Sequence, residues 1–375
     1  MSNVNPKGDG RSQQTAGAYS LSEILSQPRC WADCLKGLEA DRRIGEVGKQ
    51  FRRRSEWLFI GCGSSYYIAL AAAASWTALT GTPARAIPAS ELLLFPDLVL
   101  AGATDFAPVL ISRSGRTSEV LRAAQFLNQK KIPNIAISCA PGQKLEELAT
   151  TSILLPQADE RSTVMTRSFT SMLLALQYLA ASLGGKTEFI RALSALPEAS
   201  EKVMQTLPAR VREFMDSHRF SDYVFLGQGP YYGLACESML KLMEMSCSYA
   251  QCFHHLEFRH GPKSIVSPET LITFLLSETG YDTEREVLEE IKGLGATTLV
   301  IANRIDARAR ATADFVIELD CDLPEYARLA PFVFGGQLMG LYTGLQKGLD
   351  PDRPRNLSRV VILEEDDKRP EGAAI

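Results

Sequence analysis

An internal repeat constrains the fold of this chain more than any other feature of its sequence. Gly227 lies 166 positions after Gly61, and each of these glycines follows an apolar run and precedes another glycine two positions later. Two further loops, at 112–115 and 277–280, also follow apolar runs and are 165 positions apart. A nearly constant offset through successive elements indicates two copies of one folding unit.

Each copy alternates short apolar runs with longer helical patterns. The runs at 57–60 and 109–111 have the length of buried strands, and a helix is expected from 119 to about 128. This alternation predicts a parallel, doubly wound sheet. We therefore expect an α/β protein with two tandem, flavodoxin-like domains of three αβα layers. The expected segments are a disordered N-terminus (1–19), a helical arm (20–50), the two domains (51–195 and 196–348) and an extended C-terminal tail with a loose acidic end (349–375).

Length and charge exclude several classes of protein. A chain of 375 residues is long enough for two domains with full cores, and its formal net charge of −4 gives no reason to expect nucleic-acid binding. The longest apolar runs are too short for a membrane span, and the start does not resemble a basic and then apolar leader. We therefore expect a cytoplasmic protein. Its eight cysteines are scattered without Cys-x-x-Cys pairs, which favours reduced thiols.

A stripe of charge crosses the segment 227–246, which is expected to form a helix buried on most faces. Glu237, Lys241 and Glu244 lie at positions i, i+4 and i+7 and share one side of that helix. One interpretation is an ion pair on a strip of surface that faces solvent. The other is a cleft in which a carboxylate is held for proton transfer. The spacing alone leaves both open, and the motifs below favour the cleft.

Hydroxyl groups gather where two strands of the first copy are expected to end. A flexible loop and a helix N-terminus place backbone N–H and side-chain O–H donors around one small volume, which suits a phosphate monoester. Helix capping would explain one hydroxyl, but not several together with Ser64 and Ser65 at the neighbouring strand end. We infer that the first copy binds an anion and the second contributes the charged helix. The loop residues concerned are Ser112, Arg113, Ser114 and Thr117.

Two other ligand classes fit the sequence less well. Gly61-x-Gly63 suggests a dinucleotide site, but Tyr66 stands where that fingerprint needs glycine or alanine. A second cluster has ligand-type residues without a zinc-site spacing, and Arg259 would place a cation beside any metal. We expect no metal there and choose His260 as a catalytic histidine, because a Gly-Pro turn follows it. The cluster consists of Cys252, His254, His255, Glu257 and His260.

Taken together, the motifs resemble the tandem sugar isomerase (SIS) domains, in the order found in the isomerase half of glucosamine-6-phosphate synthase. The resemblance covers about residues 21–362, with no glutaminase domain in this sequence. The motifs are Gly61-Cys-Gly-Ser-Ser, Ser112-x-Ser-Gly-x-Thr, Met165-Thr-Arg-Ser-Phe-Thr, Glu237-x-x-x-Lys-x-x-Glu and Glu257-x-x-His-Gly-Pro. Three more are most similar to the branch of tagatose-6-phosphate ketose/aldose isomerase and galactosamine-6-phosphate deaminase: Gln27-Pro-Arg-x-Trp, Phe258-Arg-His-Gly-Pro-Lys-Ser and Asn356-x-x-Arg-Val-Val.

The resemblance implies a role for each candidate residue. Glu244 matches the carboxylate that moves a proton between C1 and C2. His260 matches a histidine that helps open the sugar ring and comes from the partner subunit, which implies a homodimer with shared sites. The residues that hold the sugar phosphate would be Ser65, Ser112, Ser114 and Thr117. In the same loop, Arg113 stands where the synthase has a glutamine. Residues that border the sugar would be Ser64 and Thr163, and those that orient the machinery Glu237, Lys241 and Glu257.

The implied activity is aldose–ketose isomerisation of a sugar phosphate, or deamination of an amino-sugar-6-phosphate, through an enediol or enolamine. One carboxylate can collect and return the proton, so no metal or redox cofactor is needed. Arg359 stands where the synthase has a lysine able to form a Schiff base, and arginine cannot form that imine. Arg359 would instead bind phosphate or close the site. The alternatives are a fructosamine-6-phosphate deglycase and a phosphosugar sensor without catalysis.

Overall fold

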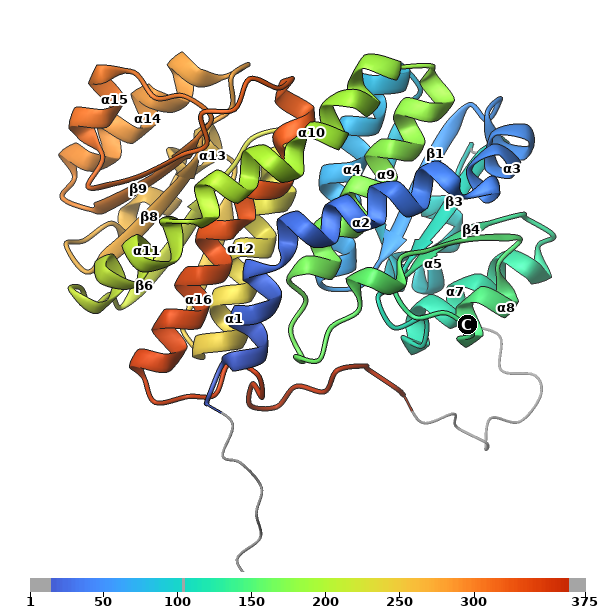
Figure 1. The fold of residues 1–375 in the computed structure, drawn as a ribbon, viewed down its shortest axis with the longest axis horizontal. Helices are drawn as coiled ribbons and strands as arrows, with labels where there is room; N and C mark the ends of the chain where they lie inside the picture. Colours follow the sequence, from blue (N-terminus) through green and yellow to red (C-terminus); the bar gives the residue numbers. More distant parts are fainter. Residues whose placement is uncertain (1–14, 103–104, 364–375) are drawn as a thin grey trace, which may run out of the picture.

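Two five-stranded parallel sheets form the framework of the molecule (Figure 1). The computed structural model describes residues 15–102 and 105–363. The first sheet has the strand order β2-β1-β3-β4-β5, and the second has the corresponding order β7-β6-β8-β9-β10. Every neighbouring pair is parallel. The prediction of two tandem, doubly wound α/β domains is therefore confirmed.

The strands are short and apolar, as expected for strands covered on both faces. The central strands β3 (Phe106–Ile111) and β8 (Thr270–Leu275) are buried at every position. The other strands of the first sheet are β1 (Glu56–Gly61), β2 (Ala84–Pro88), β4 (Ile135–Ser138) and β5 (Thr151–Leu154). Those of the second sheet are β6 (Asp222–Leu226), β7 (Ala250–Phe253), β9 (Thr297–Ala302) and β10 (Phe315–Glu318).

Helices surround each sheet, and one hydrophobic cluster runs through the inward faces of both domains while smaller clusters lie on the outer faces. The helices of the first domain are α4 (Ser64–Thr80), α5 (Ala89–Leu94), α6 (Pro96–Val99), α7 (Ser118–Gln129), α8 (Lys144–Leu148) and α9 (Arg167–Gly184). Those of the second are α12 (Pro230–Ser246), α13 (His255–Phe258), α14 (Tyr281–Gly293), α15 (Ala307–Thr312) and α16 (Phe334–Gln346). Short 3-10 turns lie at 156–158, 262–265, 325–328 and 330–333.

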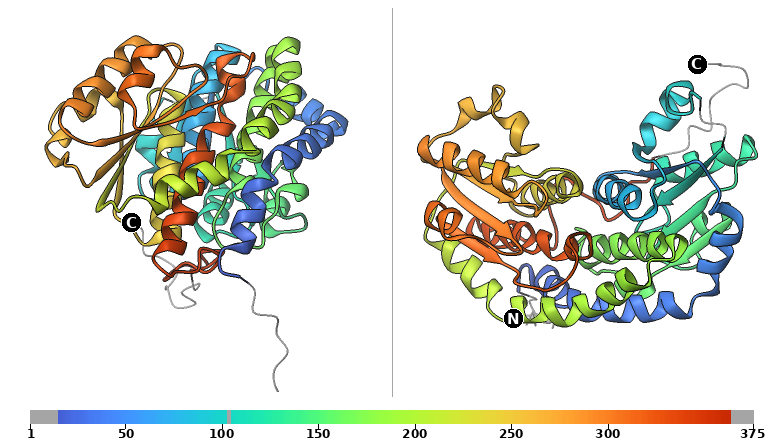
Figure 2. Two further views of the ribbon diagram at one scale, coloured as in Figure 1. Left: turned by 60° about the vertical axis from the view of Figure 1, so that its left-hand side comes forward. Right: turned by 90° about the horizontal axis from the view of Figure 1, so that it is seen from above.

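An N-terminal arm of three helices lies across both domains, as Figures 1 and 2 show. The arm consists of α1 (Ala18–Leu25), α2 (Gln27–Ala40) and α3 (Arg42–Phe51). Trp31 in α2 is fully buried, stacks on Phe334 with ring centroids 5.4 Å apart, and donates a hydrogen bond of 2.8 Å from Nε1 to the Thr170 hydroxyl. One aromatic ring therefore packs against residues from both domains.

The ends of two expected segments differ from the prediction. Residues 18–19 were expected to be disordered, but they begin α1 because the backbone N–H of Tyr19 donates to Asp352 Oδ2 at 3.0 Å. Residues 15–17 lead into this helix, with the backbone N–H of Gly17 donating to Asp350 Oδ1 at 3.0 Å, whereas 1–14 and the loose end expected at 364–375 fall outside the described residues. The proposed domain boundary after residue 195 lies within α10 (Thr187–Met204), so a helix crosses it, and α11 (Leu207–Asp216) follows.

Glycines allow α12 to lie unusually close to two neighbouring helices. A Cβ atom at Gly340 of α16 would lie 2.7 Å from the carbonyl oxygen of Lys241, and one at Gly233 would lie 2.7 Å from the backbone nitrogen of Ala71 in α4. Real Cβ contacts are longer than this, so a larger residue at either position would force the helices apart. Most of α12 is buried, which confirms the expectation of a helix covered on most faces.

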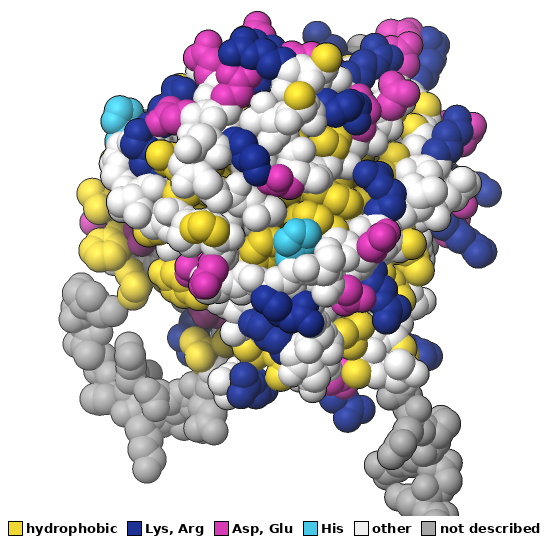
Figure 3. Space-filling model, turned by 90° about the vertical axis from the view of Figure 1, so that its left-hand side faces the viewer, with side chains coloured by type: hydrophobic (Ala, Val, Ile, Leu, Met, Phe, Trp, Pro, Cys, Tyr) yellow, Lys and Arg dark blue, Asp and Glu magenta, His cyan; other side chains and the backbone are white. Residues whose placement is uncertain are grey.

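On one face of the molecule, positively and negatively charged side chains are mixed. On the face shown in Figure 3, Lys and Arg side chains are interspersed with Asp and Glu. Across residues 15–102 and 105–363, no helix is both long and apolar enough to span a bilayer.

Candidate active site

A pocket of about 240 Å³ lies where β1 and β3 end, bordered by α12 and the C-terminal tail. It brings together most of the residues predicted from sequence: Ser64, Ser65, Arg113, Ser114, Thr117, Thr163, Glu244 and Arg359. Ligands of open α/β sheets commonly bind at this edge, outside the carboxyl ends of the strands. Sequence reasoning did not select Cys62, Met165 and Leu240, which also line it.

Two helix N-termini meet at this pocket. Ser64 and Ser65 open α4, and Thr117 is the N-cap residue of α7. The Thr117 side chain makes no capping hydrogen bond; its Oγ1 lies 3.2 Å from Oγ of the buried Ser112. Thr117 is therefore not used as a helix cap, which was the competing explanation, while the Ser114 hydroxyl accepts a hydrogen bond of 3.2 Å from the backbone N–H of Arg116 within the loop. Helix N-termini carry partial positive charge and free N–H groups, so the pocket suits an anion.

The charged stripe of α12 points into the molecule toward this pocket. Glu237 and Lys241 are fully buried, with Lys241 Nζ 3.4 Å from Glu237 Oε1 and hydrogen-bonded to Glu244 Oε2. Ser64 Oγ donates to Glu237 Oε1 at 3.2 Å, which joins the stripe to the first domain. The Glu244 side chain is 18% exposed and reaches the pocket. The geometry thus favours the cleft over the surface ion pair.

Burial shifts the proton affinities of this stripe. It raises the pKa of Glu237 to about 8, although the Lys241 ammonium opposes the shift. Burial alone would lower the pKa of Lys241, but the carboxylates of Glu237 and Glu244 outweigh it and raise that pKa above its ordinary value. A permanently charged Lys241 consequently sits between two carboxyl groups, of which the deeper one holds its proton near neutral pH.

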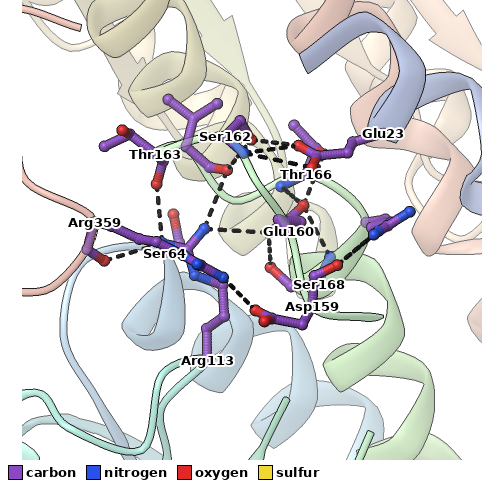
Figure 4. A network of polar contacts seen from close by, with 12 residues as sticks. Glu23, Ser64, Arg113, Asp159, Glu160, Ser162, Thr163, Thr166, Ser168 and Arg359 are labelled. Carbon is purple, nitrogen blue, oxygen red and sulfur yellow. Dashed lines mark hydrogen bonds and ion pairs between the residues drawn. The ribbon is translucent and has the colours of Figure 1, made fainter. Parts of the chain in front are cut away.

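Arg113 has partners other than the predicted phosphate. Its buried guanidinium pairs with Glu160 at 3.2 Å and donates to the carbonyl oxygens of Thr163 at 2.9 Å and Val164 at 3.2 Å. A further hydrogen bond of 3.0 Å reaches the carbonyl oxygen of Arg359 in the tail (Figure 4). Arg113 therefore joins the strand-end loop, the 160–164 segment and the tail, while its contact with phosphate remains a prediction.

A buried polar network behind Arg113 was not foreseen from the sequence. Glu160 accepts hydrogen bonds from the backbone N–H groups of Thr166 at 2.6 Å and Ser168 at 3.2 Å, as well as from their hydroxyls. Glu23 of α1 accepts a hydrogen bond from the Ser162 hydroxyl (Figure 4). The only sequence signal was the dense run of hydroxyl residues from 162 to 171. This network fixes the backbone that presents Thr163 to the pocket.

The tail lies along the pocket. The Arg359 guanidinium pairs with Asp159 Oδ1 at 2.5 Å, so in this structure its side chain bonds to a carboxylate of the chain itself. The carbonyl oxygen of Val361 accepts a hydrogen bond of 3.2 Å from the backbone N–H of Ser118, at the start of α7, and the N–H of Leu363 donates to the Ser118 hydroxyl at 2.9 Å. Of the two predicted roles for Arg359, this arrangement favours closure of the site.

Five predicted residues do not line the pocket of this chain: Ser112, Glu237 and Lys241 are buried, and Glu257 and His260 lie apart from it. Glu257 and His260 are exposed on and after α13. His254 stacks on Tyr232 with ring centroids 3.9 Å apart, and burial lowers the pKa of His255 to about 3. No group of three His, Cys, Asp or Glu side chains in the described part of the chain is arranged to hold a metal ion.

Part of this chain matches a known family model, and most of it is similar in sequence to known proteins. Residues 50–182 match the family model of the SIS domain. The isomerizing glutamine–fructose-6-phosphate aminotransferase of Pyrobaculum aerophilum is 29% identical over 367 residues, 93% of this chain and 59% of that protein. The protein of the same name from Helicobacter pylori is 27% identical over 92% of this chain and 59% of its own length. The chain thus spans about 59% of the length of these curated relatives.

Solved structures show the same fold over nearly the whole chain. Glucosamine-6-phosphate deaminase from Thermotoga maritima is 26% identical with a TM-score of 0.72, covering 92% of this chain and 100% of that one. Tagatose-6-phosphate ketose/aldose isomerase from Escherichia coli is 23% identical with a TM-score of 0.82, covering 94% and 98%, a likeness that shows the fold alone. Residues 50–182 of this chain are therefore similar to a SIS domain, and the second domain has the same strand order as the first.

Proposed function

We propose that this chain is a phosphosugar enzyme, either an aldose–ketose isomerase or an amino-sugar-6-phosphate deaminase. The observation that carries the proposal is the Glu244 carboxylate, which reaches a hydroxyl-lined pocket while the buried Lys241 ammonium holds it from behind. In such a pocket, the hydroxyl groups can bind a phosphate at one end, and the carboxylate can transfer a proton at the other.

The proposed binding mode places the phosphate among the hydroxyls of Ser65, Ser114 and Thr117, at the N-termini of α4 and α7. Ser112 supports Thr117 from behind. Binding energy from this remote group would hold the open-chain sugar with C1 and C2 beside Glu244. Ser64 and Thr163 border the sugar in this arrangement.

In the proposed reaction, Glu244 removes the proton from C2 of the aldose and returns it to C1 of the resulting enediol or enolamine. Lys241 orients Glu244, and its positive charge stabilises the oxyanion that develops on the substrate. Glu237 in turn positions Lys241 and Ser64. With an amino sugar, the ketose-level product is an imine, which water hydrolyses with release of ammonia.

We further propose a cytoplasmic homodimer in which Glu257 and His260 complete the site of the partner subunit. Their exposure in the single chain supports this arrangement, since neither reaches the pocket of its own chain. His260 would serve ring opening, and Glu257 would orient it. The site would need no metal or redox cofactor.

The test is a panel of substrates. Ammonia release is measured from glucosamine-, galactosamine- and fructosamine-phosphates, and ketose formation from neutral aldose phosphates is followed in parallel. Ammonia from one amino sugar identifies a deaminase and its substrate, and ketose without ammonia identifies an isomerase. Turnover of a fructosamine phosphate alone would favour a deglycase, and binding without any turnover would overturn the proposal in favour of a sensor.

A further inference from the structure

The second domain repeats the two pocket loops of the first, one in backbone geometry and the other in sequence position. Gly63 has φ 53° and ψ −127°, and Gly229 has φ 54° and ψ −128°, in the left-handed half of backbone space that favours glycine. In the second pair of loops, Thr279 lies 165 positions after Ser114, and both precede a glycine. The second domain thus has loops at the positions that line the pocket of the first domain, although Gly280 has φ −103° where Gly115 has φ 61°.

The donors of this second loop already hold a carboxylate from the same chain. Glu325 Oε1 accepts hydrogen bonds from the backbone N–H groups of Glu278 at 2.7 Å and Thr279 at 3.3 Å, and Oε2 accepts from the Thr279 hydroxyl at 2.7 Å. The Tyr231 hydroxyl also donates to Oε1, at 3.3 Å. Glu325 comes from the turn after β10, far along the chain from the loop that it fills. Three donors from this loop and one from α12 therefore converge on one anionic group.

The residues around this contact also differ in charge from their counterparts. Arg113 in the first loop pairs with Glu160 at 3.2 Å, whereas Glu278 in the second pairs with the buried Arg328 at 2.6 Å. The cavity beside the second loop is about 170 Å³ and has Glu325 in its wall. A phosphate monoester approaching this loop would therefore meet a carboxylate that already occupies the loop's donors.

We propose that Glu325 is an internal ligand of a second oxyanion-binding loop, in the place where the first domain would take the substrate's phosphate. The loop retains the donors of an anion site, so shortening Glu325 would let a small free oxyanion, a carboxylate or a phosphate, bind instead. The intact chain accordingly takes one phosphosugar per subunit. The role of Glu325 rests on the repeat and its contacts, and it holds whichever reaction the first domain catalyses.

The first experiment measures thermal unfolding of the full chain carrying Glu325→Ala, in formate and in chloride at equal ionic strength. The variant should unfold about 4 °C or more below the parent, because several hydrogen bonds to a charged group are lost. Formate should restore Tm with a saturable concentration dependence. The matched control is Glu198→Ala, at an exposed carboxylate, which should show neither effect. Equal responses of both variants to formate would overturn the proposal.

Inorganic phosphate is the second probe, and it is tested in a Ser114→Ala, Thr117→Ala background to remove the response of the first domain. The proposal is supported if phosphate stabilises the protein in a saturable way only after Glu325→Ala is added. It is opposed if neither phosphate nor formate stabilises the variant that carries Glu325→Ala. If Glu325→Ala does not fold, a double-mutant cycle between Glu325→Gln and Thr279→Ala decides. Additive changes in Tm would overturn the pairing, whereas a smaller effect of Thr279→Ala in the Glu325→Gln background supports it.

Discussion

Replacing Lys241 with methionine should destabilise the chain strongly, because it removes the one cation from a buried site with two carboxyl groups. The side chain of Lys241 is fully buried and lies 3.4 Å from Glu237 Oε1, while its ammonium also bonds Glu244. Breaking a buried ion pair from one side lowers the free energy of unfolding by about 3–5 kcal/mol. Methionine has a similar volume, so loss of packing contributes little to this difference.

The effect of Lys241→Met should grow with pH above about 8. In the parent chain, the Glu237 pKa is raised from 4.5 to about 8, so the stability that its proton provides is present below pH 4.5 and is lost as pH rises toward 8. Without the ammonium, Glu237 keeps its proton to higher pH, and the variant continues to lose about 1.4 kcal/mol per pH unit there. The difference in free energy of unfolding between the two proteins should therefore be nearly constant from pH 6 to 7 and larger at pH 9.

The assay is guanidinium unfolding of both proteins at pH 6, 7 and 9. Lys202→Met provides the matched control, since the Lys202 side chain is 75% exposed and lies 4.0 Å from Glu198. That change should alter the free energy of unfolding by less than about 1 kcal/mol at every pH. A Lys241→Met effect no larger than the control, or a difference between the two proteins that narrows between pH 7 and 9, would refute the reasoning.

Four further predictions concern catalysis and packing. Glu244→Gln should lower kcat at least 1000-fold, on the order expected for loss of a catalytic acid–base group, while calorimetry still detects phosphosugar binding; near-normal turnover would exclude Glu244 as the base. Ser114→Ala with Thr117→Ala should weaken phosphosugar binding about 10-fold or more with Tm little changed, and unchanged affinity would contradict the phosphate assignment. Mixed dimers of Glu244→Gln and His260→Ala subunits should recover part of the activity, whereas no recovery in confirmed mixed dimers would argue against shared sites. Gly340→Ala should lower the free energy of unfolding by about 1–3 kcal/mol through overpacking against α12, and an unchanged denaturation midpoint would show that the helices can separate freely.

The repeat made the fold predictable, because two copies of a strand–glycine–helix pattern can be recognised without any knowledge of long-range contacts. The same is true of Ser114 and Thr117, which follow a strand directly, and of the Glu237 stripe, which follows from helix geometry. The partners of Arg113 could not be predicted in this way. They come from residues 160–164 and from the tail, 47 to 246 positions away along the chain. The filling of the second loop by Glu325 depends on tertiary packing for the same reason.

The close contact between α16 and α12 supports one wall of the pocket from behind. The carbonyl of Lys241 lies against Gly340, and α16 continues into the tail that carries Arg359 past the same pocket. The helix that carries Glu244 is therefore held against α16, and the segment that covers the pocket follows α16 in the chain. A change of substrate by mutation would then be expected to proceed through the loops after β1 and β3, where a side chain can alter without moving the helix pair. Related chains that act on different sugars should accordingly vary at those loops and keep small residues along the α12–α16 contact.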